Sequence, residues 1–408
     1  MKIKSIKARE ILDSRGNPTV EVKMTLENGM FSKASVASGA STGSREAIEL
    51  RDNDSKRYNG KGVLNAVNNV NNIIANYLVG KELNQVQIDK VLIGLDGTNN
   101  KSKLGANATL GVSIASIKLL AMLEGKEVYE YLSGGKIRMP LLMVNIINGG
   151  KHAFNSLKIQ EFMIVPVVKG VKERVRISSE IFHNLKKILE ESNQSTAVGD
   201  EGGFAPNLNN TKEALDLIMN AIKVSGFIPG KEVFIALDCA ASEFYNKEKD
   251  YYEIDNMTLT KDNLLKYYLS LEKEYPIISI EDPFNESDFE SLEKLTKLVG
   301  KNIMVIGDDY FVSNSKYLEY AISKKSGNAI LLKPNQIGTI TEFTKTILLA
   351  KKNNYKCIMS HRSGETIDDV LADFAVGFAT EFIKTGSMSR GERIAKYNRL
   401  MEIEDNFI

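Results

Sequence analysis

The residues Val233-Phe-Ile-Ala-Leu-Asp238 form a short apolar run that ends on a charged residue. Later apolar runs also end on a polar or charged residue, at Glu281, Asp308, Lys333 and His361. Helix-like stretches such as Phe289–Leu298 and Ile340–Lys351 lie between them. The intervals between Glu281 and His361 fit one buried strand, one covering helix and two loops, roughly 25–35 residues. We therefore expect residues 138–408 to form a TIM-like barrel.

The first 132 residues show a different pattern. Alternating apolar and polar residues predict strands at Ile3–Arg9, Pro18–Leu26 and Met30–Val36. Apolar residues spaced three or four apart then predict helices from residue 62 to residue 130. Strands followed by helices indicate an α+β cap domain over residues 1–132 rather than a βαβ unit. The expected boundary is Ser133–Pro140.

Composition excludes several classes of protein. The 408 residues include 53 Lys plus Arg and 52 Asp plus Glu, a net charge of +1, which does not favour nucleic acid or a membrane surface. Two cysteines, Cys239 and Cys357, are too few for a disulfide scaffold or a Cys-based zinc module, and both lie in apolar runs typical of a reduced core. Residues 1–7 lack the apolar segment of a signal peptide, and residues 110–123 are interrupted by polar side chains. We expect a cytoplasmic protein with no membrane span and no nucleic-acid partner.

The polar residues that end the apolar runs carry the predicted chemistry. Active sites of barrels lie where the carboxyl ends of the strands converge. Asp238, Glu281 and Asp308 end three consecutive strands, and such carboxylates repel one another unless a cation neutralises them. With only three histidines in the chain, an all-oxygen ligand set favours a hard ion such as Mg²⁺. Lys333 beside that ion suits a general base that abstracts a proton next to a carboxylate.

The later strand ends suit an anion, although a simpler interpretation exists for each residue. His361-Arg362-Ser363 is a cluster suited to anion binding, and Lys384 ends what would be the last strand. Each charged residue after a strand is also compatible with a solvated turn, and 281–283 and 308–309 are compatible with helix N-caps. Three carboxylates followed by a lysine favour the metal-dependent enzyme.

Long motifs over nearly the whole chain resemble the enolase family, and within it the bacterial type. The motifs are Ile11–Thr19, Ser38–Glu46, Ile93–Asn107, Asn145–Gly150, Gly199–Gly203, Asp238–Glu243, Lys333–Gly338 and Ser360–Thr366. The resemblance implies reversible dehydration of 2-phosphoglycerate to phosphoenolpyruvate in glycolysis and gluconeogenesis. It also implies a ββαα(βα)6 barrel, with Met143–Ile147 and Phe162–Val165 as its first two strands.

The resemblance further implies two Mg²⁺ ions in the site. Asp238, Glu281 and Asp308 would hold the first ion, which is bound more tightly. The second would arrive with the substrate and would be held with the help of Ser41, in the loop 38–43. Racemases and cycloisomerases of the same superfamily share the three carboxylates but lack this loop and the Ser360–Thr366 cluster.

The same resemblance assigns the proton transfers and the substrate contacts. Lys333 would remove the C2 proton, and Glu201, on a loop over the barrel mouth, would protonate the departing C3 hydroxyl with support from Glu161 and Gln160. The remaining substrate contacts that it implies are Lys384 at the carboxylate, Arg362 and Ser363 at the phosphate, and His152 and His361 closing around the substrate.

The resemblance also implies a homodimer, possibly an octamer, in which Arg15 meets a C-terminal acid of the other chain such as Glu404. An additional role at the cell surface, in a secreted fraction or as a scaffold in RNA degradation is the alternative, because some family members have one. The sequence departs from the family pattern at Ala37 (usually Pro), Thr109 (usually apolar) and Phe289 (usually Trp). None of these is a catalytic position.

Overall fold

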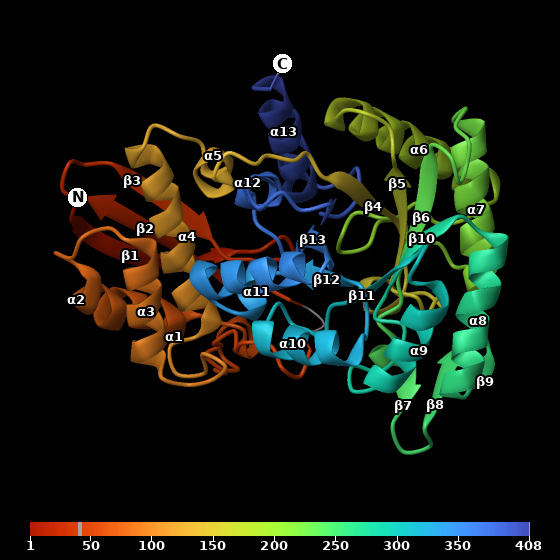
Figure 1. Cartoon of the computed structure of the whole chain (residues 1–408), viewed down its shortest axis with the longest axis horizontal. Coiled ribbons are helices and arrows are strands. Elements are labelled where there is room, and N and C mark those ends of the chain that lie inside the picture. The colour runs from red at the N-terminus through yellow and green to blue at the C-terminus, as the bar shows by residue number, and fades with distance from the viewer. Residues whose placement is uncertain (40–42, 408) are drawn as a thin grey trace.

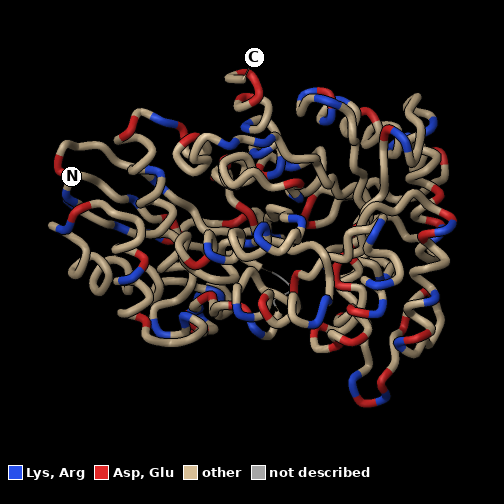
Figure 2. Tube along the Cα trace, viewed as in Figure 1, with Lys and Arg blue, Asp and Glu red and all other residues tan. Residues whose placement is uncertain are grey.

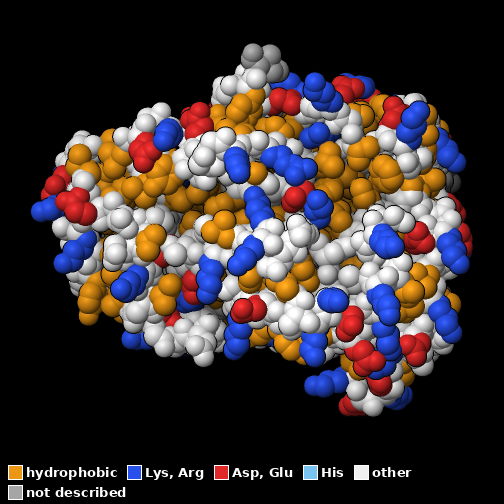
Figure 3. All heavy atoms as spheres, viewed as in Figure 1, with side chains coloured by type: hydrophobic (Ala, Val, Ile, Leu, Met, Phe, Trp, Pro, Cys, Tyr) orange, Lys and Arg blue, Asp and Glu red, His pale blue; other side chains and the backbone are white. Residues whose placement is uncertain are grey.

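A computed structural model of the chain describes residues 1–39 and 43–407. It contains an N-terminal cap, at the left of Figure 1, beside a closed eight-stranded barrel at the right. The predicted fold class, an α+β cap followed by a TIM-like barrel, is confirmed. Lys and Arg are interspersed with Asp and Glu along the trace (Figure 2), and the face in Figure 3 mixes charged with hydrophobic side chains.

The cap is built on an antiparallel sheet of β1 (Ile3–Leu12), β2 (Pro18–Leu26) and β3 (Phe31–Ser35). The buried face of this sheet packs on α4 (Ala106–Leu123), which is mostly apolar and is buried over most of its length. A helix with this composition belongs in a core. Although α4 is long and apolar enough to cross a membrane, 78% of it is buried inside the protein, as expected for a packed helix. The other cap helices are η1 (Tyr58–Gly60), α1 (Leu64–Asn68), η2 (Asn69–Ile74), α2 (Ala75–Leu78), α3 (Gln85–Asp96) and α5 (Val128–Ser133).

The barrel has one reversed strand. Its strands, in the order in which they lie around the barrel, are β10 (Ile277–Glu281), β11 (Met304–Gly307), β12 (Ala329–Leu332), β13 (Lys356–Ser360), β14 (Phe382–Lys384), β4 (Leu141–Asn148), β5 (Glu161–Pro166) and β6 (Val233–Asp238). Strand β5 pairs antiparallel with β4 and with β6, whereas the other neighbours pair in parallel. This arrangement confirms the ββαα start.

Helices surround the barrel. Two of them, α6 (Val171–Glu191) and α7 (Thr211–Val224), follow β5 before the chain enters β6. The others are α8 (Lys261–Glu274), α9 (Phe289–Val299), α10 (Ser315–Lys324), α11 (Ile340–Lys352), α12 (Val370–Gly377) and α13 (Gly391–Asp405), with short helices η3 (Gly150–His152), η4 (Ala241–Phe244) and η5 (Pro334–Gln336). The sequence did not predict the small sheet of β7 (Tyr245–Asn246), β8 (Tyr251–Ile254) and β9 (Met257–Leu259), because its strands have only two to four residues.

Buried polar contacts dock the cap on the barrel. Asp89 of α3 accepts hydrogen bonds from the backbone N–H (2.8 Å) and the hydroxyl (2.6 Å) of Thr341, in the first turn of α11. Thr109 of α4 donates to the carbonyl of Gly338 (2.8 Å), just beyond Lys333. Thr109 stands where the family usually has an apolar residue. Its hydroxyl therefore links the cap to the segment that carries Lys333. The domain bounds 1–132 and 138–408 stay a prediction, with α5 ending at Ser133 and β4 beginning at Leu141.

Candidate active site

Side-chain direction alternates along each strand, and this alternation places the charged residues next to an apolar layer inside the barrel. Side chains of a barrel strand point alternately into the barrel and out toward the helices. Met143, Met163, Ile306 and Leu331 belong to one buried cluster inside the barrel. Two residues along from Met163 lies Glu161, and two residues beyond Ile306 and Leu331 lie Asp308 and Lys333, so these three face the same interior. The apolar side chains of the strands therefore fill the barrel interior, and the polar residues at the strand ends form the next layer toward the mouth.

The structure brings the predicted residues together at this mouth of the barrel. One pocket is lined by His152, Gln160, Glu161, Glu201, Asp238, Lys333, Ser360, His361, Arg362, Ser363 and Lys384. Glu281 and Asp308 contact the lysines of this pocket, whereas Ser41 lies outside the described residues. His183 is exposed on α6 and does not line this pocket.

Lys384 is the cation at the centre of the acidic cluster. Its Nζ lies 2.8 Å from Asp238 Oδ2, 2.9 Å from Glu281 Oε2 and 3.2 Å from Glu161 Oε1. Burial lowers the pKa of Lys384, but the carboxylates, Asp238 foremost, raise it well above its usual value. Lys384 is therefore held as an ammonium ion against three acids.

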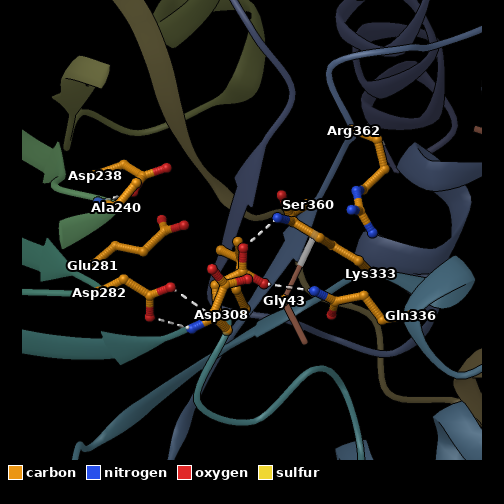
Figure 4. Close-up of polar contacts among 12 residues, drawn as sticks. Gly43, Asp238, Ala240, Glu281, Asp282, Asp308, Lys333, Gln336, Ser360 and Arg362 are labelled. Carbon is orange, nitrogen blue, oxygen red and sulfur yellow. Dashed lines mark hydrogen bonds and ion pairs between the residues drawn. The ribbon is translucent and has the colours of Figure 1, made fainter. Parts of the chain in front are cut away.

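Lys333 is paired with Asp308 on the other side of the cluster. Its Nζ donates to Asp308 Oδ2, and Gln336 Nε2 donates to Asp308 Oδ1 at 2.8 Å (Figure 4). Burial raises the pKa of Asp308, but Lys333 lowers it below its usual value. The pKa of Lys333 is raised by Asp308 despite the opposing effect of burial. The side chains alone thus favour the protonated form of Lys333, so a role as a general base would need a further positive charge beside it.

The carboxylates fit a hard divalent cation by charge and by donor type. Asp238, Glu281 and Asp308 are buried at neighbouring strand ends, as Figure 4 shows. Burial, and next the charge of Asp238, raise the pKa of Glu281 well above its usual value, which shows a cluster short of positive charge. Oxygen donors of this kind suit Mg²⁺. Asp308 is turned toward Lys333 and Gln336 here. Among the described residues, the groups with mutually close ligand atoms are instead His152, Glu161 and Glu201, and Asp282, Asp308 and Asp309.

Asp282 fixes the loop that carries Asp308. Its carboxylate oxygens accept the backbone N–H groups of Asp308 (2.8 Å) and Asp309 (2.9 Å). The helix-cap interpretation of both segments is wrong, because α9 is capped by Asp288 and α10 by Asn314. The sequence showed Asp282 only as a neighbour of Glu281, and no signal in one sequence distinguishes such a loop-holding role from a cap.

Glu201 reaches the pocket on a loop between α6 and α7. Its carbonyl accepts the N–H of Ser387 at 2.9 Å, which anchors the loop beside β14. Gly202 has φ +87°, and a Cβ there would lie 2.7 Å from the carbonyl oxygen of Ser389, so glycine is required. The Glu201 carboxylate accepts a hydrogen bond from Asn145 Nδ2 at 3.2 Å. The predicted loop over the mouth is present.

Two histidines and a second acid surround the Glu201 carboxylate. Its Oε2 lies 3.4 Å from His361 Nε2 and 3.6 Å from His152 Nδ1. Burial raises the pKa of Glu201, but His152 and His361 lower it well below its usual value. Burial, and then the charge of Glu201, raise the pKa of Glu161 well above its usual value. Glu161 is therefore the weaker acid of this carboxyl pair.

The cap supplies the partner of Arg362. Its guanidinium donates to Glu46 Oε2 (2.7 Å) and Oε1 (3.1 Å) and to Asn335 Oδ1 (3.0 Å). The sequence analysis missed Glu46 as a site residue, although it ends the Ser38–Glu46 motif. The only signal that pointed to it was that motif.

Two family comparisons match this architecture. The family described as "Enolase, N-terminal domain" matches residues 3–132, and the family described as "Enolase, C-terminal TIM barrel domain" matches residues 136–408. The chain belongs to the enolase family. Enolase-family proteins are lyases that act on small molecules and typically use Mg²⁺, in keeping with the carboxylate cluster of this site.

His361 should make the stability of this enolase-family chain depend on pH. Burial lowers its pKa to about 4, from about 6.5 for a free histidine. Between these values the unfolded chain binds a proton that the folded protein does not, so stability falls as the pH drops through this window. From pH 7.5 to pH 5 the loss from His361 is about 2 kcal/mol. Urea unfolding of His361→Gln should lack that loss.

The exposed His183 offers the matched control. The variant His183→Gln should lose stability between pH 7.5 and pH 5 as the unmodified protein does. Equal losses in the His361→Gln variant and the unmodified protein would show that His361 titrates normally in the folded state.

Proposed function

We propose that this chain is an enolase of the bacterial type, a phosphopyruvate hydratase that interconverts 2-phosphoglycerate and phosphoenolpyruvate in glycolysis and gluconeogenesis. The observation that carries the proposal is the placement of base and acid on opposite walls. Lys333 follows β12. Glu161, which lies beside the proposed acid Glu201, begins β5, four strands away in either direction around the eight-stranded barrel. A substrate between them can lose a proton on one side and a hydroxyl on the other.

Residues at the remaining strand ends can bind the two anionic groups of the substrate, its carboxylate and its phosphate. Asp238, Glu281 and Asp308 end the three strands on one arc between the walls, while the opposite arc ends in the 361–363 cluster and Lys384. Lys384 is placed to hold the substrate carboxylate, and Arg362 and Ser363 to hold the phosphate. Elimination of water from a small phosphorylated hydroxy acid needs these two anion sites beside the proton-transfer groups.

The two proton transfers are assigned to residues on opposite sides of the pocket. Lys333 takes the C2 proton, and Glu201 delivers a proton to the departing C3 hydroxyl. The pKa of Glu161 is raised beside Glu201, so we assign Glu161, with Gln160 next to it, to the support of Glu201 as the acid. His152 and His361 border the same carboxylate and close this side of the pocket.

Asp238, Glu281 and Asp308 would hold one Mg²⁺, and Ser41 would help to hold a second one that arrives with the substrate. Bound Mg²⁺ supplies positive charge against the negative charge that develops on the substrate carboxylate. Several polar atoms of the pocket lining are also free to bind a substrate. In the described part of the chain the buried Gln160 Oε1, Glu161 Oε2 and His152 Nδ1 have no hydrogen-bond partner.

Turnover should require a divalent cation. We expect purified protein to convert 2-phosphoglycerate, followed by the absorbance of phosphoenolpyruvate, only when Mg²⁺ is present, and to lose activity in excess EDTA. Asp308→Ala should fold but lose turnover, because a hard cation needs its charged oxygen ligands. The exposed Asp262→Ala should keep full activity. Full turnover in EDTA would refute the metal assignment.

Lys333 and Glu201 should be separable by isotope exchange. Lys333→Ala should lose exchange of the C2 proton of 2-phosphoglycerate with deuterated solvent, measured by NMR. Glu201→Gln should lose dehydration by about 10²–10⁴-fold, because its amide cannot deliver a proton, yet keep some C2 exchange. Exchange at the unmodified rate in Lys333→Ala would make His361 or His152 the next candidate for the base.

We also propose a homodimer as the minimal unit, with an octamer as a larger form. Within one chain, Glu404 accepts the N–H groups of Val171 (2.6 Å) and Lys172 (2.9 Å), and Arg15 donates to the carbonyl of Gly39 (3.2 Å). A contact between Arg15 and Glu404 of two chains would compete with these bonds. Light scattering at micromolar concentration should give twice the chain mass, and a monomer would contradict the proposal. No described feature favours a surface or RNA-degradation role.

A further inference from the structure

Arg393 is the largest fully buried side chain in the described protein, and none of the roles above uses it. It lies in the first turn of α13 and has no exposed surface. A buried guanidinium is expensive unless its donors are satisfied. Its hydrogen bonds therefore indicate what this charge does.

The hydrogen bonds of Arg393 converge on the two segments that carry His361 and Glu201. Nη1 donates to the carbonyl of Arg362 (2.7 Å), and Nη2 donates to those of Ser363 (2.6 Å) and Asp200 (3.1 Å). Nη1 also lies 2.7 Å from Nδ1 of His361. The guanidinium thus joins the loop after β13 to the loop that holds Glu201.

The contact with His361 has only one chemical form. Arginine donates and never accepts, so Nδ1 of His361 must be the acceptor and carry no proton. A neutral imidazole then carries its one proton on Nε2. That nitrogen lies 3.4 Å from Glu201 Oε2 without forming a hydrogen bond to it, so the ring turns its N–H side toward the acid and offers the lone pair of Nδ1 to Arg393.

The surrounding chain is shaped to admit this arginine. Gly386 has φ +86°, and a Cβ there would lie 2.7 Å from Cδ of Arg393, which leaves no room for a larger residue. Its carbonyl accepts the hydroxyl of Tyr397 at 2.7 Å, and the next residue, Ser387, binds the Glu201 carbonyl. The segment that makes room for Arg393 is therefore the one that anchors the Glu201 loop.

We propose that Arg393 is a positioning residue for the acid side of the pocket. Its guanidinium keeps Nδ1 of His361 free of a proton, so that the imidazole presents its Nε2–H to Glu201. The role in catalysis rests on the proposed function of Glu201, whereas the state of the imidazole does not.

NMR of protein with ¹⁵N-labelled histidine tests the state of the ring directly, because the chain has three histidines to resolve. At pH 7.5 the unmodified protein should show Nδ1 of His361 bare and Nε2 protonated, with the signals assigned by their loss in His361→Gln. Arg393→Met should add a proton to Nδ1, and Arg393→Lys, whose ammonium also only donates, should restore the bare nitrogen. A protonated Nδ1 in the unmodified protein overturns the proposal even if Arg393→Met fails to fold.

The kinetic test uses a matched control on the same helix. Arg393→Met should lower dehydration of 2-phosphoglycerate by about 10- to 100-fold, by analogy with the loss when a partner that orients a metal-bound histidine is removed, while C2 exchange persists. Lys396 is equally buried but binds Glu365, Thr366 and Glu392 instead. Lys396→Met should lose stability without changing the ratio of dehydration to exchange or the His361 signals.

The two readouts separate the proposal from the proposed function. If the histidine signals change as expected but no variant converts 2-phosphoglycerate, the positioning role stands and the assigned reaction fails. If Nδ1 stays bare in Arg393→Met, or if dehydration and exchange fall together, Arg393 is only a structural residue.

Discussion

The balance of buried charge at the strand ends is the constraint on which the rest of the site depends. Glu161, Asp238 and Glu281 surround one ammonium group, that of Lys384, and Asp308 takes the other, that of Lys333. Buried acids in such excess raise one another's pKa and call for an additional cation. This shortage of positive charge favours a metal ion at the strand ends, and under the proposed function Lys333 would need that ion to act as a base.

Much of the fold and part of the site could be predicted from the sequence because both follow local rules. The strands Pro18–Leu26 and Val233–Asp238 were visible as alternating or buried apolar runs, and Asp238 and Lys333 stood out because they end such runs. The resemblance to a family added the reversed second strand and the role of Glu201, which no periodicity shows. A barrel brings strand ends together, so residues far apart in sequence could be grouped without any coordinates.

The residues that escaped prediction act through contacts that one sequence does not reveal. Glu46 meets Arg362 across 316 positions of chain, and Arg393 meets His361 from a helix that otherwise looks ordinary. Asp282 binds two backbone N–H groups, which carry no side-chain signature. All three hold other site residues in place rather than form the predicted set, so their importance becomes visible only once distances are known.

The reversal of β5 has a consequence for how such a site can change over evolutionary time. Because β5 runs downward, its first residue, Glu161, is at the mouth, and Pro166 pairs with Val233 at the opposite end. The chain then returns to the mouth through α6 and leaves it again through α7 before β6 begins. This path adds one loop at the mouth, between α6 and α7. This loop carries Glu201 and joins two helices instead of a helix and a strand. The loop is tied to the barrel at Phe204, whose backbone pairs with β4, and at Glu201, whose carbonyl accepts the N–H of Ser387. Because side chains take no part in these backbone bonds, the proposed proton donor can be exchanged independently of the strand ends proposed to hold the metal.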